Sequence, residues 1–434
     1  MLAALCFATV LAIALGSYLS LCTRSLQMSS RNLSSGHSVE LAEAGMEEAL
    51  WALNKSDWTN GWTISGTTAT KTLGGFAYEN GVTGSVALTV TNFNGSLPGV
   101  VRTVTATGTT VLGDGTTSSR TLTSTSAQTP LFVNALAAVG TLSTSTIAFS
   151  SAGTVDSYDS SIGLYSAQTP TYSAIVSAAA VPATTNATAT VVLTNAQVKG
   201  YVASLYSGGP SVSSSGRVYG PSSPASPKVD ASRVSSSPYQ PLFDIRTISG
   251  GTTLSTPALN STTTLGTPTD TTPAVYRYAS LDMTGSTKII IDGPVRLIVA
   301  GNFYVGLHGG TPSIEVSTNG TLEIFTGSDI AIYGNGLNNL THDPKALALY
   351  GTNALTAPDM NTTVAFYGVI YTPTGTFKVL SNNAIYGAIV AKQLTFSGTA
   401  PVIHYDLNLR NVVFSGIDTP FSISNWRETT NPAQ

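Results

Sequence analysis

The first 22 residues contain no charged side chain, and this run constrains the fold more than any other feature. At the α-helical rise of about 1.5 Å per residue, Met1–Cys22 reaches about 33 Å, enough to cross the apolar core of a bilayer. Helix-forming residues resume over Val39–Asn54. Read as one helix, residues 1–54 make a rod roughly 80 Å long. We therefore expect a membrane-spanning and assembly helix over residues 1–54.

The predicted helix changes character along its length. Its first part is apolar on every side, whereas over Val39–Asn54 apolar residues recur at three- and four-residue steps and glutamates fill the other faces. Such a pattern is typical of a helix that buries one face. The residues that we expect to form the assembly surface are Leu5, Leu11, Leu15, Val39, Ala42, Glu43, Met46, Ala49, Leu50 and Leu53.

The composition limits the classes of function. Charged residues make up only 9% of the 434 residues and the net charge is −3, so the chain lacks the basic surface that nucleic-acid binding requires. Ser and Thr alternate with β-branched residues, which favours extensive β structure outside the cell. We expect a single-pass, membrane-anchored protein with the remainder periplasmic or extracellular, and no nucleic-acid partner.

Both cysteines, Cys6 and Cys22, lie in the uncharged run. Sixteen residues of helix separate them by about 24 Å, so they cannot form a disulfide within one chain. The run is long for a signal peptide and lacks a clear cleavage site of small residues. We therefore expect the helix to be retained.

After the helix the hydrophobic period changes to two. Ser85–Thr91, Val100–Val111 and Arg120–Ser126 alternate between apolar and polar residues, and Asp114-Gly115 stands where a hairpin turn is needed. We predict a small antiparallel β meander over residues 55–129. The alternative is that these strands begin a single larger β domain.

Residues 130–420 contain many short β runs at a regular spacing. Ile314–Val316, Leu322–Ile324 and Ile330–Ile332 follow one another at steps of eight residues, and a similar series over residues 289–305 lies about one coil earlier. Three steps of one strand and one turn make one coil of a parallel β-helix. We predict a right-handed parallel β-helix, with a β-sandwich as the alternative fold.

Two stretches are rich in Ser, Thr, Gly and Pro, at about residues 207–237 and 250–272. We interpret both as surface excursions from the coils. Val192–Ala203 and Val379–Ala391 are similar to one another, which places coils of one solenoid on both sides of these stretches. Residues 421–434 are expected to form a cap over the last coil and a tail.

The site-like groups of residues are weak. His404-Tyr405-Asp406 places a base and an acid on one strand face, but a hydrogen-bond cluster explains it as well as catalysis does. Glu315 and Glu323 are expected to lie on different walls and to be solvated, and Asp156 and Asp159 to cap a turn. The Asn- and Gly-rich loop before His342-Asp343 lacks the carboxylates of known calcium loops. We expect no catalytic residue, no cofactor and no metal site.

Two stretches resemble known proteins. The uncharged helix running into Ala42–Asn54 (AEAGMEEALWALN) resembles the N-terminal segment of PilX-type minor pilins and related type IV pilin-like proteins, although no glutamate stands near residue 5. Phe366–Pro373, Tyr386–Lys392 and His404–Asp406 resemble the C-terminal β-solenoid region of PilX-like and other bacterial surface proteins. The first resemblance implies a helix that is held in the membrane before assembly and packs inside a filament afterwards.

These observations predict a structural, non-enzymatic component of a type IV pilus or pseudopilus-like surface assembly. Its expected partners are the membrane through residues 1–22, other pilin-like subunits, and a surface or carbohydrate ligand. The alternatives are a membrane-tethered polysaccharide-degrading β-helix enzyme and a stand-alone surface adhesin. The enzyme would need Lys or Arg and Asp residues that converge on one wall.

Overall fold

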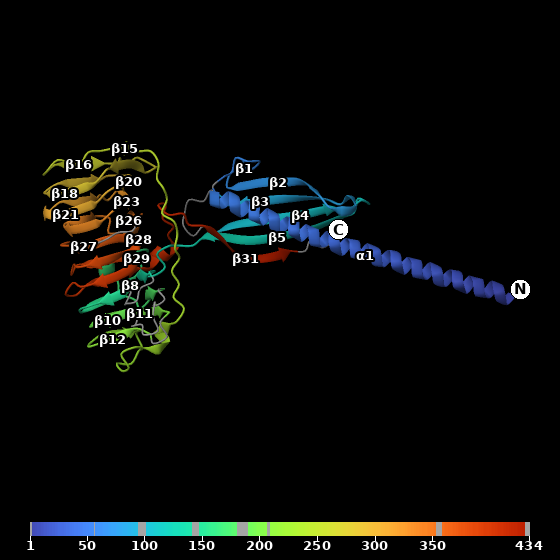
Figure 1. The fold of residues 1–434 in the computed structure, drawn as a ribbon, viewed down its shortest axis with the longest axis horizontal. Coiled ribbons are helices and arrows are strands. Elements are labelled where there is room, and N and C mark those ends of the chain that lie inside the picture. Colours follow the sequence, from blue (N-terminus) through green and yellow to red (C-terminus); the bar gives the residue numbers. More distant parts are fainter. Residues whose placement is uncertain are drawn as a thin grey trace. The chain divides into compact units, whose positions relative to one another are not determined.

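The computed structural model describes residues 2–55, 57–93, 101–140, 147–179, 190–205, 209–352 and 358–429. The chain divides into two compact units. The first, which we call the helix–sheet unit, comprises Met1–Thr129 together with Pro420–Gln434, and the second, the parallel-strand unit, comprises Pro130–Thr419. One long N-terminal helix followed by mainly β structure is therefore the architecture of the chain (Figure 1).

The helix–sheet unit consists of one helix and one antiparallel sheet. The helix α1 runs without interruption over Leu2–Lys55. The sheet has the order β1-β2-β3-β4-β5-β31, and the C-terminal half of α1 packs on it. Its strands are β1 Thr63–Ser65, β2 Thr68–Ala77, β3 Thr83–Thr91, β4 Arg102–Val111, β5 Thr117–Gln128 and β31 Phe421–Thr429, and a 3-10 turn covers Glu79–Gly81.

The turn between β4 and β5 forms where the Asp-Gly pair predicts it. The backbone N–H of Leu112 donates to the Thr116 carbonyl over 2.8 Å, and the Asp114 carboxylate accepts from the Thr116 N–H over 2.9 Å. Gly115 adopts a φ of 82°, which a residue with a Cβ rarely takes. Turn chemistry thus sets the register of this hairpin.

The C-terminal segment corrects the prediction of a cap. Phe421–Thr429 forms β31, the edge strand of the helix–sheet unit, and pairs antiparallel with β5 from Phe421 opposite Gln128 to Thr429 opposite Thr121. The whole parallel-strand unit is therefore inserted between two neighbouring strands of one sheet. Sequence reasoning missed this because an edge strand buries little and carries a weak alternating pattern, and its partner strand lies almost 300 residues earlier.

In the parallel-strand unit every ladder between described strands is parallel, which contradicts the alternative of a β-sandwich with antiparallel pairing. Leu297 pairs with Ile324, and Ile324 with Leu349, so circuits of 27 and 25 residues return the chain to the same place. The strands of the series over residues 289–305 pair with Ile314–Val316, Leu322–Ile324 and Ile330–Ile332 in the same order.

The strands of this unit lie on three walls. The first wall carries β15 Thr252–Thr253, β17 Ala274–Tyr278, β20 Pro294–Val299, β23 Thr321–Thr326, β26 Leu347–Gly351, β6 Leu136–Ala138, β9 Ala174–Ala178 and β14 Val234–Ser235. The second carries β18 Leu281–Gly285, β21 Phe303–Gly310, β24 Ile330–Gly334, β27 Asp359–Thr362, β7 Ile147–Phe149, β10 Val191–Thr194 and β12 Ser211–Ser213. The third carries β16 Thr262–Leu265, β19 Lys288–Ile291, β22 Ser313–Val316, β25 Gly336–Asn339, β30 Val402–Asp406, β8 Gly153–Tyr158 and β13 Arg217–Tyr219.

Three longer strands bend from one wall to the next: β28 Phe366–Val379, β29 Ala384–Phe396 and β11 Ala196–Ser204. Short 3-10 turns cover Tyr165–Ala167, Ala231–Arg233, Pro344–Ala346 and Leu407–Asn411. Side chains that point inward from the three walls form one continuous apolar core along the stack, in which Phe149 and Phe396 stack with ring centroids 4.3 Å apart. This core is the main source of stability for the unit.

The coils are not stacked in chain order. β29 pairs with β6 and β7, and β30 pairs with β8, so the end of the unit in sequence lies on its beginning, in the middle of the stack (Figure 1). The chain runs from there to β14 at one end. It then crosses to β15 at the other end through residues 236–251, which we call the crossing segment, and coils back.

This path corrects the expected excursions. Residues 207–237 and 250–272 contain β12–β14 and β15–β16, which pair in parallel with their neighbours and form the two end coils. An end coil has a neighbour on one side only, so a Ser- and Thr-rich strand such as β16 suffices there. The excursion from the stack is the crossing segment between them.

Candidate functional site

The N-terminal half of α1 exposes apolar side chains over its whole length. Leu5, Leu11 and Leu15 are 67%, 61% and 61% exposed, and the exposed apolar residues continue to Leu33. The best 18-residue window has a mean hydropathy of 2.0, and α1 is long and apolar enough to cross a membrane. A signal sequence meets the same criteria. An apolar surface of this extent is stable only in lipid or against other apolar surfaces.

The second part of α1 is already occupied by the sheet. Ala42, Met46, Ala49 and Leu53 are buried against β3, β4 and β5, whereas Val39 and Leu50 are half-buried and Glu43 is exposed. The expected assembly residues therefore fall into two groups. Leu5, Leu11 and Leu15 are available to partners, and the apolar residues beyond residue 40 mainly hold the helix on its own sheet.

Small and hydroxyl-bearing residues set how closely α1 approaches the sheet. A Cβ at Gly108 of β4 would overlap the Ser38 carbonyl, and a Cβ at Gly45 would overlap Leu88 and Val86. The Thr110 hydroxyl lies 2.6 Å from Ser34 Oγ and 2.9 Å from Ser38 Oγ. Sequence reasoning missed these positions because glycine and serine interrupt the apolar stripe.

The parallel-strand unit carries a ladder of aromatic and titratable side chains on its third wall. Tyr367, Tyr386, His404 and Asp156 are successive partners across β28, β29, β30 and β8. The rings of Tyr367 and Tyr386 stack with centroids 4.2 Å apart, and burial raises the pKa of Tyr367 to about 12. The ladder joins residues that the sequence separates by up to 248 positions.

Asp156 is the centre of this ladder. His404 Nδ1 lies 2.6 Å from Asp156 Oδ1, Tyr165 Oη donates to Oδ2 over 3.0 Å, and Lys199 Nζ lies 3.8 Å from Oδ2. Asp156 and His404 are only 1% and 7% exposed, and the Tyr165 ring covers His404 at 3.7 Å. Burial, and then Asp156, raise the pKa of Tyr165 above its ordinary value.

The structure thus brings together the Asp and Lys residues that the enzyme alternative would need, but it also covers them. Asp156 does not cap a turn as expected, whereas Asp159 does, since its carboxylate accepts from the Ser161 N–H over 2.9 Å. A carboxylate with three protein donors beneath a tyrosine ring offers a polymer no access. The cluster is a satisfied polar network that joins coils.

Asp406, the third member of the predicted triplet, is buried beside this network. Its Oδ1 accepts from the backbone N–H groups of Ser160 and Asn408 over 2.9 and 3.0 Å, whereas Oδ2 has no hydrogen-bond partner among the described residues. Burial raises the pKa of Asp406 above its ordinary value. His404 and Asp406 therefore serve different contacts rather than one dyad.

The two glutamates lie on different walls, as expected, but they are not simply solvated. Glu315 pairs with Lys288 and Glu323 with Arg296, each over 2.8 Å and each 27 residues from its partner, which is one coil. Ser415 also donates to Glu323 over 2.9 Å. These pairs fix neighbouring coils, and the carboxylates are not arranged to act together on a substrate. Among the described residues, no group of three or more His, Cys, Asp or Glu side chains could hold a metal ion.

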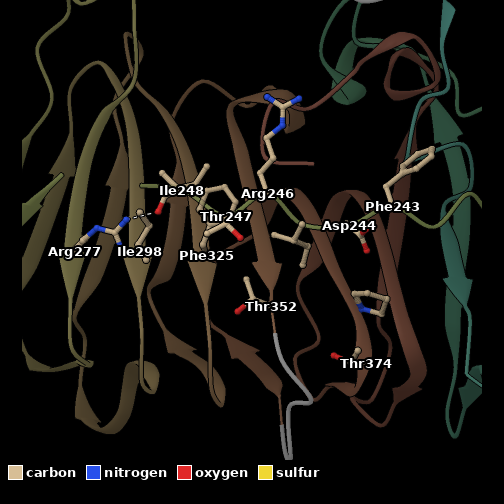
Figure 2. Close-up of a pocket in the computed structure, with 13 residues that line it drawn as sticks. Phe243, Asp244, Arg246, Thr247, Ile248, Arg277, Ile298, Phe325, Thr352 and Thr374 are labelled. Atoms are coloured by element: carbon tan, nitrogen blue, oxygen red, sulfur yellow. Dashed lines mark hydrogen bonds between the residues drawn. The ribbon is translucent and has the colours of Figure 1, made fainter. Parts of the chain in front are cut away.

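A cavity of about 570 Å³ lies where the crossing segment passes over the stack. Figure 2 shows its residues, with Phe243 to Ile248 on the crossing segment and Ile298, Phe325 and Thr352 on the strands. Arg277 reaches up from β17 and donates to the Ile248 carbonyl (Figure 2). A second cavity, of about 500 Å³, lies near β14 and contains Arg233 and Arg410.

The crossing segment is tied down along its length. Tyr371 Oη donates to the Phe243 carbonyl over 2.8 Å and lies 3.1 Å from the Phe243 nitrogen. Ile245 forms an antiparallel bridge with Ile417, and Arg246 pairs with Asp418 over 2.8 Å. The first cavity is therefore roofed by a segment that holds the start and the end of the coiled path together.

Comparisons with known proteins add little to this geometry. A family model described as Domain of unknown function (DUF7305) matches residues 258–412, which run from just before β16 to just after β30. No curated protein matches the chain. Among solved structures, the competence-associated pilin ComZ from Thermus thermophilus is similar at 12% sequence identity over 91% of this chain and 97% of that chain, with a TM-score of 0.23. At that identity and score, the similarity supports no conclusion about this chain.

Proposed function

We propose that this protein is a structural, non-enzymatic subunit of a type IV pilus or pseudopilus-like assembly, similar to PilX-type minor pilins. In this proposal α1 is retained in the mature protein as the membrane anchor and as the assembly surface. The parallel-strand unit is a right-handed parallel β-helix that is displayed in the periplasm or outside the cell. Parallel ladders with repeating circuits of similar length support that assignment.

The observation that carries the proposal is the contrast between the two halves of α1. One continuous helix is covered by its own sheet from about residue 34 onward, and before that it exposes apolar side chains on every side. A rigid apolar rod that its own unit leaves uncovered can exchange lipid for neighbouring rods without refolding. Assembly by packing needs no catalytic group.

The anchoring step is tested by placing charges in the uncharged run. Arginine near the centre of a membrane helix costs about 2.5–3.5 kcal/mol, so Leu11→Arg with Leu15→Arg should release the protein from the membrane fraction. The same exchange at Leu26 and Leu33, which are also exposed but lie beyond the run, is the matched control and should leave the protein in the membrane. Retention of the first variant would contradict anchoring by residues 1–22.

The enzyme alternative is tested separately. The full-length protein in detergent should leave acidic and neutral polysaccharides uncut, as judged by reducing ends and by the absorbance of unsaturated products. Cleavage that is lost in Asp156→Asn would show that the covered Asp156 cluster opens and acts on substrate, and the structural proposal would then fail.

A further inference from the structure

The cavity near β14 holds two guanidinium groups close together. Arg233 donates to the Tyr172 carbonyl over 2.9 Å, and Arg410 donates to the carbonyl of the next residue, Ser173, over 2.7 Å. The Arg233 guanidinium also lies 4.5 Å from the centre of the Tyr201 ring. Because consecutive backbone carbonyls hold them, both positive charges are fixed at one place before any ligand binds.

Neither charge is neutralised by the protein. Among the described residues Arg233 and Arg410 form no ion pair, and the cavity lining contains no Asp or Glu. The stretches of this unit outside the described residues contain no Asp or Glu either. In the same unit Arg246 and Arg296 each have a carboxylate within 2.8 Å. Two uncompensated like charges repel one another, so an anion in this cavity would be stabilised.

The rest of the lining favours a sugar over a simple ion. Tyr201 and Tyr239 are 41% and 60% exposed and offer apolar rings with hydroxyl groups, and three serines, Ser232, Ser235 and Ser237, add further hydroxyls. The volume of about 500 Å³ lies within the range of small-ligand sites. Rings pack against the C–H faces of a sugar, and guanidinium groups bind a carboxylate with two parallel hydrogen bonds.

We propose that this cavity binds a carboxylate-bearing sugar, such as a uronic acid unit of an acidic polysaccharide. This site is independent of the assembly proposal, because it uses no residue of α1. Inorganic phosphate shares the anionic chemistry, and a neutral sugar shares the rings and hydroxyls. Comparing the three ligands therefore separates the contributions.

The test is calorimetric titration of the full-length protein in detergent with a galacturonic acid tetramer. A neutral galactose tetramer and inorganic phosphate serve as the comparison ligands. The acidic tetramer should bind at least tenfold more tightly than either. No binding of the acidic tetramer at millimolar concentration, or equal binding of the neutral tetramer or of phosphate, would overturn the assignment.

Two pairs of variants locate the site. Ser235→Glu places a carboxylate in the cavity without removing any packing, and it should weaken binding at least tenfold, whereas Ser213→Glu, on an exposed residue of the same end coil, should not. Arg233→Gln should weaken binding similarly. Its control is Arg217→Gln, because Arg217 also lies over a tyrosine ring and donates to a backbone carbonyl but does not line the cavity. Unchanged binding in Ser235→Glu would place the ligand elsewhere.

Discussion

At the scale of single residues, the contacts that matter most are those that set close approach or bury a polar atom. Gly108 allows the backbone of α1 to lie against β4, and Asp406 keeps one carboxylate oxygen buried without a partner. Both depend on three-dimensional neighbours that no local pattern reveals. Substitutions at these two positions therefore give sharp tests.

Gly108→Ala should loosen α1 from the sheet. The added methyl group overlaps the Ser38 carbonyl, which belongs to helix backbone and cannot turn aside, so we expect a loss of about 1–3 kcal/mol. Hydrogen exchange of the amides in β4 and in the second half of α1 should become faster. Gly74→Ala is the matched control, since nothing lies within 4 Å of its Cβ. Equal protection in both variants would show that the close approach is not required.

Asp406→Asn should change how stability depends on pH. Because burial raises the pKa of Asp406 in the folded protein, the folded state binds a proton more tightly than the unfolded state, and stability falls as the pH rises above about 4. Asn keeps the acceptor and carries no charge. The melting temperature of the variant relative to the natural protein should thus increase between pH 4 and pH 7, whereas the exposed Asp270→Asn should show a constant difference. Parallel curves for Asp406→Asn would contradict the buried-charge account.

At the scale of elements, the crossing segment holds the coiled path together. It connects the two end coils and also bridges to the last residues of the unit through Ile245 and Ile417. The Tyr371 hydroxyl is its main tie to the stack. A segment fastened by a few contacts opens more readily than the strands beneath it.

Tyr371→Phe should release the crossing segment locally. The substitution removes the hydroxyl that contacts both the nitrogen and the carbonyl of Phe243, which should cost about 1–3 kcal/mol. Hydrogen exchange over residues 240–250 should become faster while the strands keep their protection. Tyr304→Phe is the control, because that hydroxyl has no backbone partner among the described residues. If residues 240–250 exchange equally in both variants, other contacts hold the segment.

Local periodicity predicted the long helix, the Asp-Gly turn and the offset between successive strand triplets, because each depends on residues that are close in sequence. It could not predict that Phe421–Thr429 joins β5 or that β29 lies on β6, because both pairings connect distant segments. Composition also misled: Ser- and Thr-rich stretches were taken for excursions, whereas the ends of the stack tolerate such strands. His404 was singled out, but its partner Asp156 was not.

At the scale of the whole molecule, the account depends on one claim, that the apolar half of α1 is never exposed to water in the native state. The described residues provide nothing to cover Leu5 to Leu33. Lipid or other copies of the same helix must therefore do so. The two cysteines of the chain, both in this half, provide natural reporters.

The most direct measurement is thiol labelling of Cys6 in membranes and assembled material, in a Cys22→Ser background, with a membrane-impermeant maleimide. The comparison is Gly36→Cys with both natural cysteines changed to Ser, because Gly36 is exposed with open space around its Cβ. The account predicts that Cys6 stays unlabelled until denaturant is added, while the cysteine at position 36 labels at once. Equal labelling at both positions would contradict it.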